Sequence, residues 1–72
     1  MPDATATSIT LNGDPYPLDG DMPLTALLER LKMRRGRVAV EINREIVPRA
    51  NYDATIVRVG DQVEIINFVG GG

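Results

Sequence analysis

The chain has 72 residues, of which 43% are hydrophobic, with a formal net charge of −2 and no Cys or His. This composition excludes disulfides and the usual zinc ligands, and the acidic balance argues against nucleic-acid binding. A domain of this size buries only about 60% of the surface that its unfolded chain exposes. We therefore expect a single domain, residues 1–72, stabilised by aliphatic packing.

The N-terminal segment MPDATATS has neither a basic region nor an apolar stretch of the kind found in signal peptides. We expect residues 1–6, which are small and mostly polar, to be frayed. The chain also has no apolar run long enough for a membrane span. The expected location is therefore the cytoplasm, with no membrane partner.

Residues 7–12 alternate between polar and apolar side chains, which is typical of a strand. Asn12-Gly13 then gives a strong signal for a tight hairpin turn, and a return strand follows over residues 16–18. Pro15 and Pro17 have no amide hydrogen to donate. The return strand is therefore expected to be short or to lie at a sheet edge.

Four leucines, spaced as on one face of a helix, follow this hairpin. We expect the helix to begin at Asp21 or Met22, with Pro23 in its first turn, and to end before Gly36. The leucines of the apolar face are Leu24, Leu27, Leu28 and Leu31.

A cluster of three arginines lies near the expected end of the helix: Arg34, Arg35 and Arg37. At that place the cations would complement the helix dipole from a solvated surface. The other interpretation is a docking site for a phosphate or an acidic partner. Both stay open from the sequence, and the first is favoured because cations are common at helix ends.

From Val38 the hydrophobic period changes to two, which predicts a strand with Val38, Val40 and Ile42 facing the helix. A tight turn at residues 43–45 leads to a short return strand that Pro48 ends. Residues 49–60 are expected to form an irregular connector, closed by a turn at Gly60-Asp61. The last strand is expected over residues 62–69.

This order of elements predicts an α+β protein with the β-grasp fold, in which one helix packs on one face of a four- to five-stranded mixed sheet. In that fold the final strand lies between the first and the third. Val63 and Ile65 would then face the core, and Glu64, Ile66 and Phe68 would face outward.

An apolar patch rimmed by charge is therefore expected on the outer face, made of Ile66, Phe68 and Ala39. Such a patch often marks an interface, and we interpret it as a docking surface for a partner. The alternative is that Tyr52 or Ile56 of the connector covers it. Its position beside the C-terminal residues favours docking.

Three of the seven glycines, Gly70, Gly71 and Gly72, end the chain directly after an apolar strand. Nothing in a core requires them there, and glycine tolerates nearly all backbone conformations. We expect a flexible tail, roughly 10 Å long when extended, that presents the carboxylate of Gly72 to the active site of another protein.

Three segments carry a resemblance to a known family: INREIVPR at residues 42–49, GDQVEII at residues 60–66, and the terminal VGGG. In this order and spacing they resemble the ThiS family, the sulfur carriers of thiamine biosynthesis, over almost the whole chain. One departure is Pro23, which stands where relatives often have a Thr at the helix start.

The resemblance implies a carrier whose C-terminal glycine is adenylated by an E1-like, ThiF-type adenylyltransferase. A persulfide donor would then supply the sulfur of a thiocarboxylate, which is presented to a ThiG-type thiazole synthase. Gly72 would carry the sulfur and Gly71 would be its small neighbour. The partner would use the ATP, so no cofactor is expected on this chain.

The residue types agree with a carrier that is not itself an enzyme. The chain has no phosphate-binding glycine loop followed by a helix, no thiol nucleophile and no imidazole base. Activation of a carboxylate must then come from a partner. If the protein handles sulfur, only its C-terminus can hold it.

Other functions remain open from the sequence. The small subunit of molybdopterin synthase also ends in Gly-Gly, but it usually has prolines where this chain has Asn67, Phe68 and Val69. A ubiquitin-like modifier would use the same tail, although Lys32 is the only lysine and argues against chain formation. A regulatory or RNA-binding β-grasp module would be expected to have a basic face.

Overall fold

The computed structural model describes residues 7–68, so the predictions for residues 1–6 and 69–72 lie outside the described range. Its first strands, β1 (Ser8–Leu11) and β2 (Asp14–Pro17), pair antiparallel as the predicted hairpin. Asn12 and Gly13 form the turn with φ angles of 51° and 90°, the left-handed pair that a type I′ turn requires. Strand β2 lies at the sheet edge, as its prolines indicated.

Helix α1 spans Leu24–Arg30 and is shorter than predicted at both ends. Its N-cap is Pro23, in an extended conformation, so the predicted boundary at Asp21 or Met22 is wrong. Met22 and Pro23 instead form the short strand β3 (Met22–Pro23). No side chain caps this end, and the amide of Leu24 donates to the carbonyl of Thr55 at 2.9 Å.

The C-terminus of α1 is a Schellman motif. The amide of Met33 donates to the carbonyl of Leu28 at 2.9 Å, and the amide of Lys32 donates to the carbonyl of Glu29 at 3.0 Å. Lys32 has the left-handed φ of 60° that this motif needs, and Met33 packs against the core. The predicted stop at Gly36 is therefore wrong, because the apolar contact of Met33 favours an earlier end.

A second hairpin follows, formed by β4 (Val38–Ile42) and β5 (Glu45–Val47). Asn43 and Arg44 make its turn with φ angles of 53° and 70°, so both hairpins have left-handed turns led by an asparagine. Pairing ends before Pro48, as predicted. Val38 and Val40 are buried and Ala39 faces away from the core, which confirms the predicted alternation.

The connector predicted as irregular over residues 49–60 contains regular structure. A 3-10 helix covers Arg49–Ala54, and strand β6 (Ile56–Val57) pairs with β3. Val57 is fully buried, so this pairing closes one side of the core. Gly60, with φ of 93°, makes the predicted turn into the last strand.

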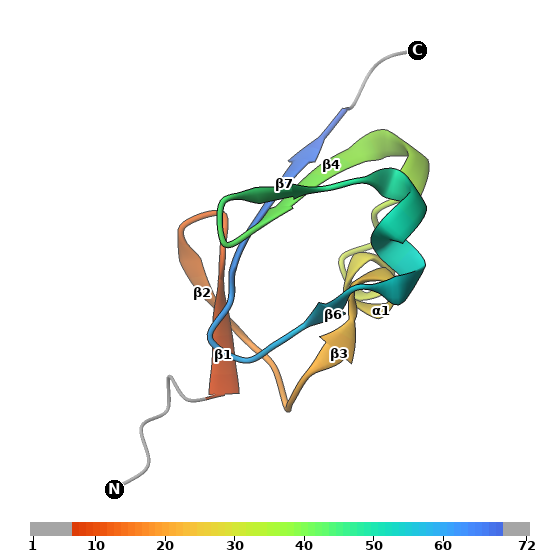
Figure 1. The fold of residues 1–72 in the computed structure, drawn as a ribbon. Helices are drawn as coiled ribbons and strands as arrows, with labels where there is room; N and C mark the ends of the chain where they lie inside the picture. Colours follow the sequence, from red (N-terminus) through yellow and green to blue (C-terminus); the bar gives the residue numbers. More distant parts are fainter. Residues whose placement is uncertain (1–6, 69–72) are drawn as a thin grey trace, which may run out of the picture.

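Strand β7 (Gln62–Asn67) is the central strand of the sheet, whose order is β2-β1-β7-β4-β5. It pairs parallel with β1 and antiparallel with β4, which confirms the mixed β-grasp sheet (Figure 1). The strand ends at Asn67, so its predicted continuation through Phe68 is wrong, and the predicted last residue, Val69, lies outside the described residues. Within residues 7–68 no helix has the length and hydrophobicity that crossing a membrane requires.

The core lies between α1 and the inner face of the sheet. Both α1 and β7 contribute side chains that are almost fully buried, and no polar or charged residue of the described range is buried with them. This economical core fits the small size of the chain. Its members are Ile9, Leu18, Leu24, Leu27, Leu28, Val38, Val40, Tyr52, Val57, Val63 and Ile65.

Candidate functional site

The outer face of the sheet carries the predicted apolar patch. Ala39 of β4 lies directly opposite Ile66 of β7, as the inferred pairing required. Ile66 is 61% exposed and Phe68, just beyond the end of β7, is 52% exposed. The amide of Phe68 donates to the carbonyl of Arg37 at 2.7 Å, which continues the pairing of the two strands. The patch therefore lies on the surface of the sheet and includes Phe68, the last described residue.

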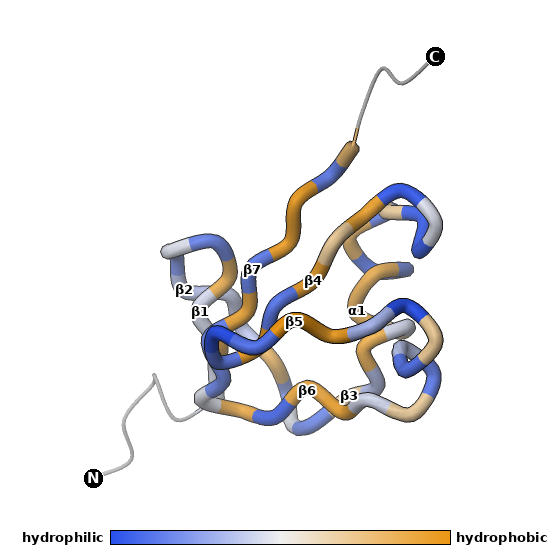
Figure 2. Tube along the Cα trace, turned by 45° about the horizontal axis from the view of Figure 1, so that its top comes forward, coloured by the Kyte–Doolittle hydropathy of each residue, from blue (hydrophilic) through white to orange (hydrophobic). Residues whose placement is uncertain are grey.

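A groove of about 260 Å³ crosses the same face between β5, β4 and β7, which lie side by side with hydrophobic stretches in each (Figure 2). Ile46 of β5, at 74% exposure, is the most exposed large hydrophobic residue of the described range. Ile46 is not among the site residues predicted from the sequence, although its place opposite Glu41 could be inferred from the tight turn between β4 and β5. The groove is lined by Ala39, Val40, Glu41, Ile46, Glu64 and Ile66.

Two asparagine side chains hold β7 in place from the neighbouring hairpin turns. The amide of Ile65 donates to Oδ1 of Asn12 at 2.8 Å, and Nδ2 of Asn12 donates to the carbonyl of Ile65 at 3.2 Å. On the other side, the amide of Gln62 donates to Oδ1 of Asn43 at 2.9 Å. Because both neighbours bind β7, its outward side chains stand on a rigid element, which suits a recognition surface.

Tyr52 and Ile56, the connector residues that could have covered the patch, do not line the groove on this face. Tyr52 is a core residue, 2% exposed, and its hydroxyl lies 3.3 Å from the carbonyl of Val38, to which it donates. Ile56 pairs with Pro23 and lines a different pocket, at the β5 edge of the sheet. The patch is therefore open to solvent in the described part of the chain.

The structure divides the arginine cluster, because α1 ends before it. Arg35 and Arg37 lie in a 3-10 helix, Arg35–Arg37, and Arg34 precedes it. Nη1 of Arg35 lies 2.8 Å from Oδ1 of Asp53, so Arg35 ties this segment to the connector. The interpretation of the cluster as the end of α1 is wrong, because the helix ends at Arg30, before all three arginines.

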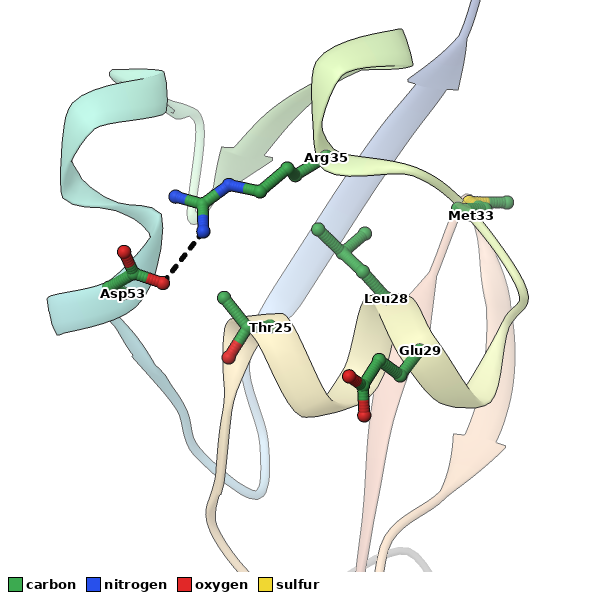
Figure 3. A pocket seen from close by; sticks show the side chains of 6 residues that line it. All are labelled: Thr25, Leu28, Glu29, Met33, Arg35 and Asp53. Carbon is green, nitrogen blue, oxygen red and sulfur yellow. Dashed lines mark hydrogen bonds and ion pairs between the residues drawn. The ribbon is translucent and has the colours of Figure 1, made fainter.

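The ion pair of Arg35 and Asp53 spans a second pocket, of about 330 Å³, beside α1 (Figure 3). The Arg35 guanidinium also lies 5.8 Å from the centre of the Tyr52 ring. Its contacts are thus accounted for by packing between segments of the chain. The pocket is lined by Thr25, Leu28, Glu29, Met33, Arg35 and Asp53.

Among residues 7–68 there is no gathering of three or more side chains that could ligate a metal. In the same range every buried side-chain nitrogen or oxygen has a hydrogen-bond partner. The remaining predicted site residues, Gly70, Gly71 and Gly72, lie outside the described residues. Val69 alone separates Phe68 from Gly70 in the sequence, so the patch directly precedes the glycine tail.

Comparison with known proteins gives a family match. The sequence model of the ThiS family matches residues 9–72. A crystal structure of the thiamine biosynthesis protein ThiS from Geobacter metallireducens is 43% identical, with a TM-score of 0.76 over 90% of this chain and 99% of that chain. The sulfur carrier protein ThiS of Escherichia coli is 41% identical over 46 residues, which are 64% of this chain and 70% of that protein.

Another relative is much longer than this chain. A thiazole synthase of Magnetococcus marinus is 39% identical over 64 residues, which cover 89% of this chain. The chain spans only 20% of the length of that thiazole synthase. A segment similar to most of this chain therefore occurs within a larger protein.

Proposed function

The chain belongs to the ThiS family of sulfur carriers in thiamine biosynthesis, and on this premise we propose that the carboxylate of Gly72 is its sulfur-carrying group. A carboxylate is a poor electrophile, because its oxygen is a poor leaving group and its charge repels nucleophiles. The family membership and the terminal glycines together support activation of this group by a partner enzyme. The chain itself acts as carrier and co-substrate.

The proposed loading has two parts. The Gly72 carboxylate oxygen attacks the α-phosphorus of ATP held by the partner, which forms an acyl adenylate and releases pyrophosphate. A persulfide then attacks the acyl carbon, AMP leaves with the carboxylate oxygen, and an acyl disulfide forms. A thiol cleaves the sulfur-sulfur bond, so that the thiocarboxylate stays on Gly72 and the donor leaves as a mixed disulfide.

The proposed partners are an adenylyltransferase of the ThiF type, a persulfide donor and a thiazole synthase of the ThiG type. The thiazole synthase is supported by the relative that contains a segment similar to this chain. Joining a carrier to its acceptor enzyme raises the local concentration of the tail, which is an advantage when binding is weak. Ordering a glycine tail opposes binding by roughly 1–2 kcal/mol per residue, so release between partners is favoured.

We assign the docking of these partners to the patch Ile66, Phe68 and Ala39. The exposure of Ile66 and Phe68, together with the rigid strand that carries Ile66, supports this assignment. An apolar surface beside the tail would hold the body of the carrier while Gly70, Gly71 and Gly72 enter the active site. The body thus selects the partner and the tail takes part in the chemistry.

Intact mass spectrometry tests the proposal. After incubation with the adenylyltransferase, ATP, a persulfide donor and a thiol, we expect a mass gain equal to the exchange of one oxygen for sulfur, localised to Gly72. Deletion of Gly72 should abolish the gain without changing the unfolding transition. Gly36→Ala is the matched control, since a Cβ at Gly36 meets no atom within 4 Å.

A wild-type chain that stays unmodified under these conditions would overturn the proposal. Adducts to lysines of other proteins on denaturing gels, without a thiocarboxylate, would instead indicate a protein modifier.

A further inference from the structure

Two glutamates face each other on the outer face of the sheet. Glu41 of β4 and Glu64 of β7 are direct partners in the antiparallel pairing, so their Cβ atoms lie about 4.5–5.5 Å apart. Like charges in such a pair destabilise a sheet. Within residues 7–68 the salt bridge is that of Arg35 with Asp53, and neither glutamate has an ion pair. Folding therefore brings together two carboxylates that nothing in the described chain neutralises.

The surroundings of the pair are apolar on two sides. Ile46 lies opposite Glu41 on β5, and Ile66 is the next outward residue after Glu64 on β7. Glu41 is half-buried, whereas Ile46 and Ile66 are exposed. Glu41, which is half-buried, and Glu64, which is exposed, thus line a groove with hydrophobic walls.

We propose that this groove receives one arginine side chain of the ThiF-type adenylyltransferase. This inference rests on the proposed carrier function, because it deepens the docking surface assigned above. The aliphatic stem of the arginine would pack on Ile46, Ala39 and Ile66, and its guanidinium would bind Glu41 and Glu64 together. Arginine suits the place because its planar group presents several donors at once and is weakly hydrated.

The dimensions of the groove favour a single side chain over a small molecule. Its volume of about 260 Å³ lies below the roughly 300–1,000 Å³ of most small-molecule sites. Two carboxylates without a third potential ligand also make a poor metal site in this part of the chain. The groove shares Ala39 and Ile66 with the docking patch, so a partner on the patch would cover it.

Removal of the two negative charges should affect the stability of the free chain and its binding to the partner in opposite directions. Like charges directly opposite each other generally destabilise a sheet, and an arginine from the partner would compensate the charges of Glu41 and Glu64 on binding. Replacement of both glutamates by glutamine is therefore expected to stabilise the free chain or leave its stability unchanged, while it weakens the complex. A purely structural role would give the opposite sign for stability.

The experiment compares Glu41→Gln/Glu64→Gln with a control that makes the same change of charge elsewhere. The control is Asp19→Asn/Glu29→Gln, since both residues are exposed and lie away from the groove. Binding to the ThiF-type adenylyltransferase is measured over a range of salt concentrations. The groove variant should bind at least about tenfold more weakly at low salt and depend less on salt, with an unchanged or higher melting temperature.

A double-mutant cycle can identify the arginine. Arginines of the adenylyltransferase are replaced one at a time by alanine, and each change is combined with Glu64→Gln. We expect one arginine whose replacement is clearly non-additive with Glu64→Gln, because both changes remove the same contact.

Several results would overturn the inference. Wild-type affinity of the groove variant, with normal sulfur loading of the wild type, refutes the arginine site and leaves the carrier function standing. A fall in the melting temperature of the groove variant would indicate a structural role. Sedimentation that shows a wild-type dimer, dissociated by the same variant, would make a second copy of this chain the occupant. A failure of the carrier function would appear separately, as absence of the thiocarboxylate on the wild type.

Discussion

The two faces of β7 differ in what surrounds their side chains. Val63 and Ile65 point to the helix and are 0% and 4% exposed, whereas Ile66, directly after Ile65, is 61% exposed. The buried inward positions Val63 and Ile65 are both apolar, whereas the outer face combines Ile66 with the charge of Glu64. Alternation along one strand thus places the stabilising side chains on one face and leaves the other exposed to solvent.

This difference indicates that the stability of the fold and the surface of the outer face depend on different residues of the chain. In a chain of this length the core is small, so few of its side chains can change without loss of folding. The outer face lies across the strand from that core, and its residues Ile66 and Phe68 are more than half exposed. Changes on the two faces should therefore have separable effects.

The largest expected effect comes from a matched pair of substitutions at neighbouring isoleucines. Ile65→Ala should lower the free energy of unfolding by about 2–5 kcal/mol, because it leaves a cavity in the core. Ile66→Ala should change it by no more than about 0.5 kcal/mol. Urea denaturation measures both. If Ile65→Ala does not fold, Ile65→Val should still cost about 0.5–1.5 kcal/mol.

Equal losses at Ile65 and Ile66 would contradict the division of the strand into two faces. They would mean that a segment outside the described residues covers Ile66.

A smaller effect is expected where β7 is held by Asn12. Asn12→Gly keeps a residue that tolerates the φ of 51° but removes both side-chain bonds to Ile65, so we expect a loss of about 1–3 kcal/mol. Asn12→Asp keeps the acceptor for the Ile65 amide and should lose less. Thermal unfolding followed by circular dichroism gives the ranking. Wild-type stability of Asn12→Gly would show that the turn alone positions the strand.

The smallest effect on stability is expected at Phe68. Phe68→Asp should change the free energy of unfolding by about 0.5 kcal/mol or less, since the side chain is half exposed and lies beyond the end of β7. Its binding to the adenylyltransferase should nevertheless weaken strongly, because a charge replaces an apolar contact in the interface. Calorimetric titration compares it with Ala50→Asp, which adds the same charge at an exposed position of the connector.

A large fall in melting temperature for Phe68→Asp would place Phe68 in the core. Equal binding of Phe68→Asp and Ala50→Asp would remove Phe68 from the docking surface.

Local patterns in the sequence were sufficient to predict most of the elements of the fold. The period of two in β4 and β7, the leucine spacing of α1 and the Asn-led turns act over a few residues, and each was confirmed. Pro15 and Pro17 placed β2 at the edge for an equally local reason, the missing amide hydrogen. The order of these elements then favoured one sheet, with β7 in the centre.

Only the tertiary structure decided the features that depend on contacts between distant segments. The Schellman motif at Lys32 and Met33 ended α1 at Arg30 because Met33 packs on the core. Tyr52 entered the same core although the connector was expected to be irregular. The meeting of Glu41 with Glu64 likewise follows from the register of two strands separated along the chain. Such contacts are set by how whole elements pack, which no short stretch of residues encodes by itself.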